Sequence, residues 1–222
     1  MVKNKPVYSF EEADSKKRML LGGKGAGLSE MTRLKLPVPP GFTITTEVCN
    51  KYYDNNRKLP KDVMPAVMKN IAKMEKKTGK KWNSIKNPLL VSVRSGAAIS
   101  MPGMMDTILN LGLNEKTVEG FAEQTKNPRF SWDSYRRFIQ LFGKVVFGVN
   151  DEKFDHVLDS AKTKQGVTDD SKLNVESLKT IVSEYKKICE EHTKRKFPDT
   201  PDEQLVLSIE AVFKSWMGER AI

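Results

Sequence analysis

Residues 21–27 read LGGKGAG, a glycine-rich stretch with a single lysine, Lys24. Glycines permit positive φ and leave room for a ligand beside the backbone, while Leu28, Met31 and Leu34 follow with helical spacing. We expect a loop that carries Lys24 and leads into a helix, an arrangement that favours phosphate. The spacing is neither that of a P-loop nor that of a clean GxGxxG motif, so a glycine-rich turn without a ligand remains an alternative.

The predicted secondary structure divides the chain into two regions. The first mixes strands and helices, and the second is almost entirely helical. Short apolar, β-branched segments predict strands in the first region, and aromatic and aliphatic residues with helical spacing fill the second. The sequence Thr200-Pro201-Asp202-Glu203 predicts a capping box with proline at the first helical position. The fold class is therefore α+β, with a mixed α/β subdomain over 1–112 and a mainly helical subdomain over 113–222. The predicted strands are 7–10, 42–45, 89–93 and 107–111, and the helical stripes cover 132–146, 154–161 and 178–189.

Composition excludes several classes of protein. With 222 residues, 38% hydrophobic and 30% charged, the chain is neither collagen-like nor disordered. No apolar run approaches the ~20 residues that span a bilayer, and the N-terminus lacks the apolar core of a secretory signal. We therefore expect a cytoplasmic protein without a membrane partner, in which Cys49 and Cys189 are reduced and packed and His156 and His192 lie on the surface.

The formal net charge of +10 favours anionic partners without selecting one. The densest basic stretch, residues 69–81, places Lys69, Lys73, Lys76 and Lys80 on one face of an amphipathic helix. A solvated face is the expected interpretation, with nucleic-acid or lipid binding as alternatives. No aromatic residues interleave with these charges and no nucleic-acid-binding motif is present, so a nucleic-acid partner is not expected.

Arg94 stands at the end of the apolar strand segment, followed by Ser95 and Gly96. Strand alternation places Ser92 and Arg94 on one face, opposite Val91 and Val93. A guanidinium suits phosphate oxygens, although pairing with a carboxylate at a sheet edge is the alternative. The loop that follows has three methionines in five positions, which suits either an adaptable lid or a hydrophobic gap filler.

Several of these segments together resemble the pyruvate, phosphate dikinase family, specifically the start of its N-terminal nucleotide-binding domain. The resemblance covers the chain from about Val7 to Ile222. It rests on residues 22–31 (GGKGAGLSEM), 36–46 (LPVPPGFTITT), 91–97 (VSVRSGA), 100–112 (SMPGMMDTILNLG), 134–140 (SYRRFIQ) and 211–216 (AVFKSW).

The resemblance implies a partial ATP-grasp-like domain that binds Mg-ATP. Family members use ATP and phosphate to phosphorylate a histidine on a carrier domain, releasing AMP and pyrophosphate, and a C-terminal barrel then converts pyruvate to phosphoenolpyruvate. By the same resemblance, Lys24 and Arg94 are the catalytic polyphosphate-binding pair, with Gly103 and Arg137 near the phosphates. The resemblance also implies a homo-oligomer.

The chain departs from the family pattern in what it lacks. The family's acidic Mg²⁺ ligands, its carrier histidine motif and its barrel are not found in the sequence, so no metal ligand is assigned and the isolated chain is expected to be inactive. Two alternatives are a fragment of phosphoenolpyruvate synthase, which uses water in place of phosphate, and a short basic binding or regulatory module.

Overall fold

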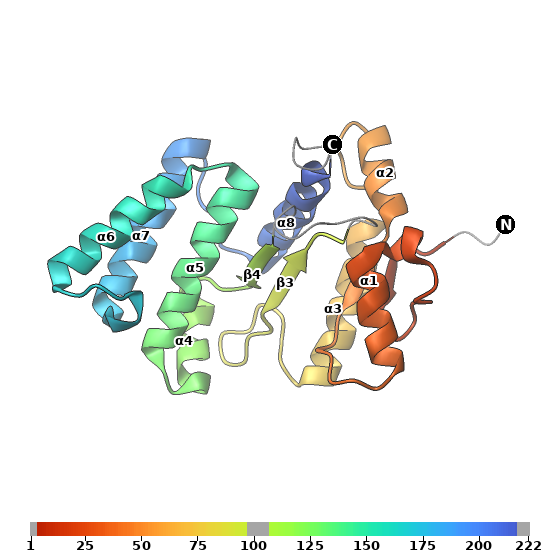
Figure 1. Cartoon of the computed structure of the whole chain (residues 1–222), viewed down its shortest axis with the longest axis horizontal. Helices are drawn as coiled ribbons and strands as arrows, with labels where there is room; N and C mark the ends of the chain where they lie inside the picture. Colours follow the sequence, from red (N-terminus) through yellow and green to blue (C-terminus); the bar gives the residue numbers. More distant parts are fainter. Residues whose placement is uncertain (1–3, 97–106, 217–222) are drawn as a thin grey trace. The chain divides into compact units, whose positions relative to one another are not determined.

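The computed structural model describes residues 4–96 and 107–216, which are called the described residues below (Figure 1). The candidate residue Gly103 lies outside them. Contacts divide the chain into two compact units, each of which is considered by itself. The first unit comprises Met1–Lys80, Arg94–Asp106 and Val212–Ile222, and the second comprises Lys81–Val93 and Thr107–Ala211. The subdomain division at residue 112 remains a prediction.

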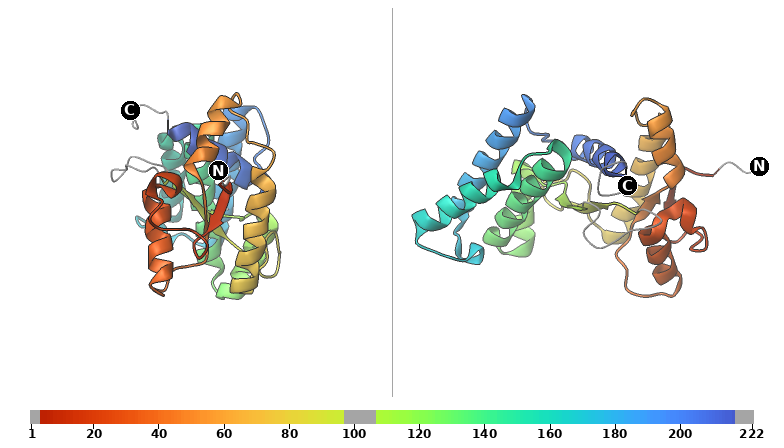
Figure 2. Two further views of the ribbon diagram at one scale, coloured as in Figure 1. Left: turned by 90° about the vertical axis from the view of Figure 1, so that its right-hand side faces the viewer. Right: turned by 45° about the horizontal axis from the view of Figure 1, so that its top comes forward.

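A two-stranded antiparallel sheet lies at the centre of the first unit. Its strands pair Val7 with Ile44 and Ser9 with Phe42, so the predicted strands form but are each one residue shorter. The helix α1 packs on β2 and on α2, while α3 packs on β1. The left view of Figure 2 shows β1 between α1 and α3. The elements are β1 (Val7–Ser9), α1 (Arg18–Arg33), β2 (Phe42–Ile44), α2 (Thr46–Asp54) and α3 (Val63–Thr78).

The helix α3 carries the lysine-rich stretch. Val63, Val67 and Ile71 recur every four residues and are buried, so this face holds the helix against the unit. On the remaining surface, Lys73 pairs with Glu12 at 2.5 Å, and Lys77 pairs with Glu11. Lys69, Lys76 and Lys80 are exposed to solvent.

The second unit is built around the long helix α5. This helix packs against α4, α6, α7 and β4, and α6 and α7 run side by side (Figure 1). The strands β3 and β4 pair in a second two-stranded sheet, and Arg94 at the end of β3 is assigned to the first unit. The bounds are β3 (Val91–Arg94), β4 (Thr107–Leu111), α4 (Glu115–Thr125), α5 (Pro128–Phe147), α6 (Asp151–Gln165), the 3-10 turn η1 (Asp170–Lys172), α7 (Val175–Thr193) and α8 (Pro201–Ser215).

Both ends of α5 have local causes. The Asn127 side chain accepts a hydrogen bond from the Phe130 amide, proline occupies the first position, and Gly148 ends the helix in the left-handed conformation. Its aromatic stripe forms the core of the unit, with Tyr135 and Phe138 fully buried. The capping box predicted for α8 is confirmed in part: the Glu203 amide donates to Thr200 Oγ1 at 3.3 Å, and Pro201 is the first helical residue.

The predicted α+β class is confirmed: two small sheets accompany a predominantly helical chain. None of the helices among the described residues has the length and apolar character needed to cross a bilayer.

Candidate functional site

The glycine-rich segment is helical rather than a loop, with one interruption. Inside α1 only Gly22 leaves the helical conformation, at φ 70° and ψ 168°, and the helix resumes at Gly23. The loop predicted over 21–27 is therefore wrong for residues 23–27. Packing explains the difference, because a Cβ on Gly25 would lie 2.7 Å from Thr43 Oγ1, so glycine lets α1 lie close against β2. Lys24 consequently stands in the first turn after the break, near the positive end of a helix dipole.

The break at Gly22 is in contact with the segment that follows β3. A Cβ built on Gly22 would lie only 1.4 Å from the carbonyl oxygen of Gly96. A Cβ on Gly96 would lie 3.9 Å from Lys24 Cβ. The structure thus brings the lysine segment and the end of the arginine strand together within the first unit, although they are 70 residues apart in sequence.

Both candidate cations in this unit are exposed and available. Ser92 and Arg94 are exposed while Val91 and Val93 are half-buried, which confirms the predicted alternation of β3. Among the described residues, neither Lys24 nor Arg94 has a hydrogen-bonding or ion-pair partner, so the alternative of a carboxylate beside Arg94 finds no support there. Two cations without partners among the described residues, carried on touching segments, suit a multiply charged anion.

A tryptophan from the C-terminal end of the chain anchors the residue after Arg94. Trp216 Nε1 donates a hydrogen bond to Ser95 Oγ at 3.0 Å, and Ser95 is buried. Both residues belong to the first unit. The two residues that follow Arg94 are therefore both held in place, Ser95 by Trp216 and Gly96 by Gly22. The sequence segment 211–216 gave no indication of this contact.

Arg137 belongs to the second unit, on α5, and is described there by itself. Its side chain is 58% exposed, and its Nε donates to Asp133 Oδ2 at 3.1 Å. The terminal amino groups of Arg137 have no partner among the described residues. Among the described residues, the Arg137 guanidinium thus donates a hydrogen bond from Nε, while Nη1 and Nη2 have no partner.

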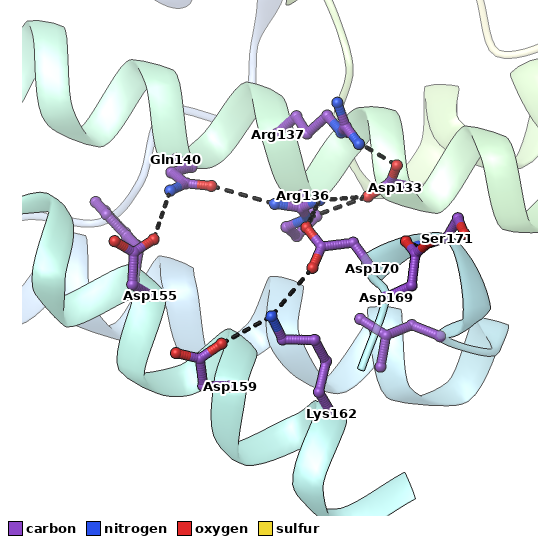
Figure 3. Close-up of polar contacts among 12 residues, drawn as sticks. Asp133, Arg136, Arg137, Gln140, Asp155, Asp159, Lys162, Asp169, Asp170 and Ser171 are labelled. Carbon is purple, nitrogen blue, oxygen red and sulfur yellow. Dashed lines mark hydrogen bonds and ion pairs between the residues drawn. The ribbon is translucent and has the colours of Figure 1, made fainter. Parts of the chain in front are cut away.

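The neighbouring Arg136 is used in the opposite way (Figure 3). It is buried, and its Nη2 lies 2.6 Å from Asp133 Oδ1 and 3.5 Å from Asp170 Oδ2. Its Nη1 donates to Gln140 Oε1 at 3.2 Å. Asp170 in turn lies 3.3 Å from Lys162 Nζ. Sequence reasoning missed this network, although an aspartate three and four residues before two arginines is the helical spacing that brings such side chains together.

The remaining reactive side chains are placed as the sequence predicts. Cys49 and Cys189 are free and buried, and burial raises the pKa of each thiol to about 12, so both are unreactive. His156 and His192 are exposed. Within the described residues, no group of three or more His, Cys, Asp or Glu side chains is placed to hold a metal ion.

Comparison with known proteins identifies the family. A family model described as "Pyruvate phosphate dikinase, AMP/ATP-binding domain" matches residues 18–59 and 54–222. The chain is 53% identical over 216 residues to the pyruvate, phosphate dikinase of Entamoeba histolytica, covering 97% of this chain and 24% of that protein. It is 48% identical over 217 residues to the enzyme of Clostridium symbiosum, covering 97% and 25%.

A plant relative agrees with these two. The chloroplastic pyruvate, phosphate dikinase of Flaveria pringlei is 45% identical over 221 residues, which cover 98% of this chain and 23% of that protein. The chain thus spans about a quarter of the length of the relatives that it matches. Because the family model covers nearly the whole sequence, the chain belongs to the pyruvate, phosphate dikinase family and corresponds to its ATP-grasp-type, AMP/ATP-binding domain.

Proposed function

We propose that this chain is the nucleotide-binding part of a pyruvate, phosphate dikinase, and that Lys24 and Arg94 bind the polyphosphate of ATP. The observation that carries the assignment is the contact of Gly22 and Gly96. It joins the segments bearing two exposed cations that have no partner in the part of the chain that the structure describes. Gly103 and Arg137 are proposed as further residues near the phosphates.

The whole protein would use ATP and phosphate to phosphorylate a histidine on a carrier domain, releasing AMP and pyrophosphate. The phosphohistidine would then supply a pyruvate-binding barrel that forms phosphoenolpyruvate. Phosphoryl transfer depends mainly on positioning and on electrostatic stabilisation of charge on the phosphoryl oxygens. Lys24 and Arg94 would supply that stabilisation from fixed backbone positions.

Mg²⁺ is expected to accompany ATP, where it would neutralise charge on the phosphate oxygens. The described residues present no cluster of metal-binding side chains, so they do not fit a resident metal. On the resemblance to the family, the ligands for Mg²⁺ are proposed to lie outside this chain, and the isolated chain is proposed to be inactive. We also propose a homo-oligomeric assembly and a cytoplasmic location. Some relatives, in contrast, are named chloroplastic.

Two isotope exchanges in the full dikinase that contains this chain test the assignment. Lys24→Ala and Arg94→Ala should each reduce label exchange between AMP and ATP by on the order of 10²-fold, as loss of one charge-stabilising donor does elsewhere. Label exchange between pyruvate and phosphoenolpyruvate should change little, because it takes place at the barrel.

A matched control is Lys76→Ala, which removes an exposed lysine from α3 of the same unit. It should leave both exchanges unchanged. Equal losses in the two exchanges for Lys24→Ala and Arg94→Ala would contradict the assignment, because such losses would report general damage to the protein.

A further inference from the structure

We propose that Asp133 is a positioning residue that holds the guanidinium of Arg137 so that its terminal amino groups face a phosphate group. The inference rests on the proposed function, since it takes Arg137 to be a phosphate ligand. It goes beyond that function by naming the residue that orients the ligand.

The two carboxylate oxygens of Asp133 accept hydrogen bonds from two different arginines. Asp133 lies on α5 one helical turn before both arginines, so it meets the residues at i+3 and i+4. Its Oδ1 accepts from Arg136 Nε at 3.2 Å and Nη2 at 2.6 Å, whereas its Oδ2 accepts from Arg137 Nε at 3.1 Å. Each oxygen therefore serves a different arginine.

The Asp133 side chain is itself held in place by burial and by its pair with Arg136. It is only 10% exposed, and its partner Arg136 is 4% exposed and further bound by Asp170 and Gln140. A carboxylate fixed in this way has a defined orientation, which a solvent-exposed ion pair lacks. The contact with Arg137 therefore restrains an otherwise flexible side chain.

Arg137 lies at one end of a series of ion pairs. The charges alternate from Arg137 through Asp133, Arg136, Asp170 and Lys162 to Asp159, where the last pair is 2.7 Å apart (Figure 3). Arg137 is the terminal cation, and it uses only Nε within the network. Its two terminal amino groups have no described partner and retain the planar fork that matches phosphate oxygens.

The phosphate group could belong to ATP or to inorganic phosphate, and both are substrates of the proposed reaction. Steady-state kinetics of the full dikinase distinguish the two, with KM measured separately for each. Arg137→Gln and Asp133→Asn should both raise the same KM, each on the order of tenfold, with little change in kcat. The other KM should stay near its wild-type value.

A double-mutant cycle separates positioning from a general structural role. If Asp133 acts through Arg137, adding Asp133→Asn to the Arg137→Gln protein should raise that KM no further. Equal effects of Asp133→Asn in both backgrounds would overturn the inference while leaving the role of Arg137 intact. An unchanged KM in Arg137→Gln itself would overturn both that role and the inference.

Two further variants guard against loss of folding, because Arg136 is buried and needs a carboxylate. Asp133→Glu keeps the charge but displaces the carboxylate by one methylene, and should raise the same KM while the protein remains folded. A folded Asp133→Glu protein with wild-type KM values would count against the inference. Lys144→Gln removes another cation of α5, which pairs at the surface with Asp151 of α6, and should leave both KM values unchanged.

Discussion

The two units of this molecule use the same types of charged residue in opposite ways. In the first unit, Lys24 and Arg94 are exposed, lack partners among the described residues, and are held in place by the backbone. In the second unit, Arg136 is buried and bound by Asp133, Asp170 and Gln140. The two sets of cations differ in their partners rather than in their residue types, and this difference supports the proposal that Lys24 and Arg94 bind a ligand.

The largest expected effect follows from placing a side chain at the backbone contact of the first unit. Gly22→Ala introduces a Cβ 1.4 Å from a carbonyl oxygen at a positive φ, so it should destabilise the protein by about 3 kcal/mol or more. Chemical denaturation measures this loss. Gly27→Ala is the matched control, because its helical Cβ meets nothing within 4 Å.

Gly27→Ala should stabilise the protein by roughly 0.5–1 kcal/mol, since alanine is favoured over glycine inside a helix. If the two variants unfolded at similar denaturant concentrations, the backbone contact would not be holding the first unit together.

The next largest effect is expected at Arg136 in the second unit. Arg136→Met removes a buried cation from two carboxylates and should lower the free energy of unfolding by about 2–4 kcal/mol. Arg137→Met removes an exposed neighbour and should cost no more than about 1 kcal/mol. Urea denaturation of the two proteins checks the contrast, which would fail if their midpoints were alike.

A smaller effect is the acid titration of a paired but exposed carboxylate, Glu30 on α1. Hydrogen bonds from Arg33 and then Ser15 lower its pKa from the ordinary value of 4.5 to about 2. Its contribution to stability is therefore fully present above pH 4.5 and is lost as the pH falls toward 2. Carboxyl chemical shifts measured by NMR against pH should show this low pKa.

The Glu30→Gln variant completes this test. It should remove the contribution of Glu30 to the pH dependence of stability between pH 4.5 and 2, while the contributions of the other carboxyl groups remain. A Glu30 carboxyl that titrates near 4.5 would show that the pairing does not form in solution.

The smallest effect on stability is expected at the proposed ligand-binding cations. Lys24→Ala and Arg94→Ala break no contact with the described residues, so the unfolding free energy should change by no more than about 0.5 kcal/mol. Thermal or chemical denaturation of both variants measures this change. A large loss would indicate a structural role and would remove the distinction between the two units.

Periodicity was sufficient to predict most of the fold. The buried residues of α5 and α7 and the alternation of β3 follow directly from side-chain spacing, which depends on local geometry alone. One feature required tertiary information. Glycine-rich residues 23–27 are helical because Gly25 packs against Thr43, and no local signal reveals that distant neighbour.

The candidate site was likewise only partly predictable. Lys24 and Arg94 stand out because their sequence contexts are unusual, and the structure places their segments in contact. The untested roles of both residues remain proposals. Asp133 was not singled out, although its spacing to Arg136 and Arg137 is visible in the sequence. Asp170, which also pairs with Arg136, lies more than 30 residues away, so the network itself could not be foreseen.

The contact between Gly22 and Gly96 has a thermodynamic consequence for ligand capture. The separation of the lysine and arginine segments is set by main-chain atoms, which have no rotamers to lose when a ligand arrives. The conformational entropy of aligning these segments is lost once, during folding, and not again at each binding event. Only the side chains of Lys24 and Arg94 would then remain to be ordered, so this proposed pair would be largely preorganised before a nucleotide binds.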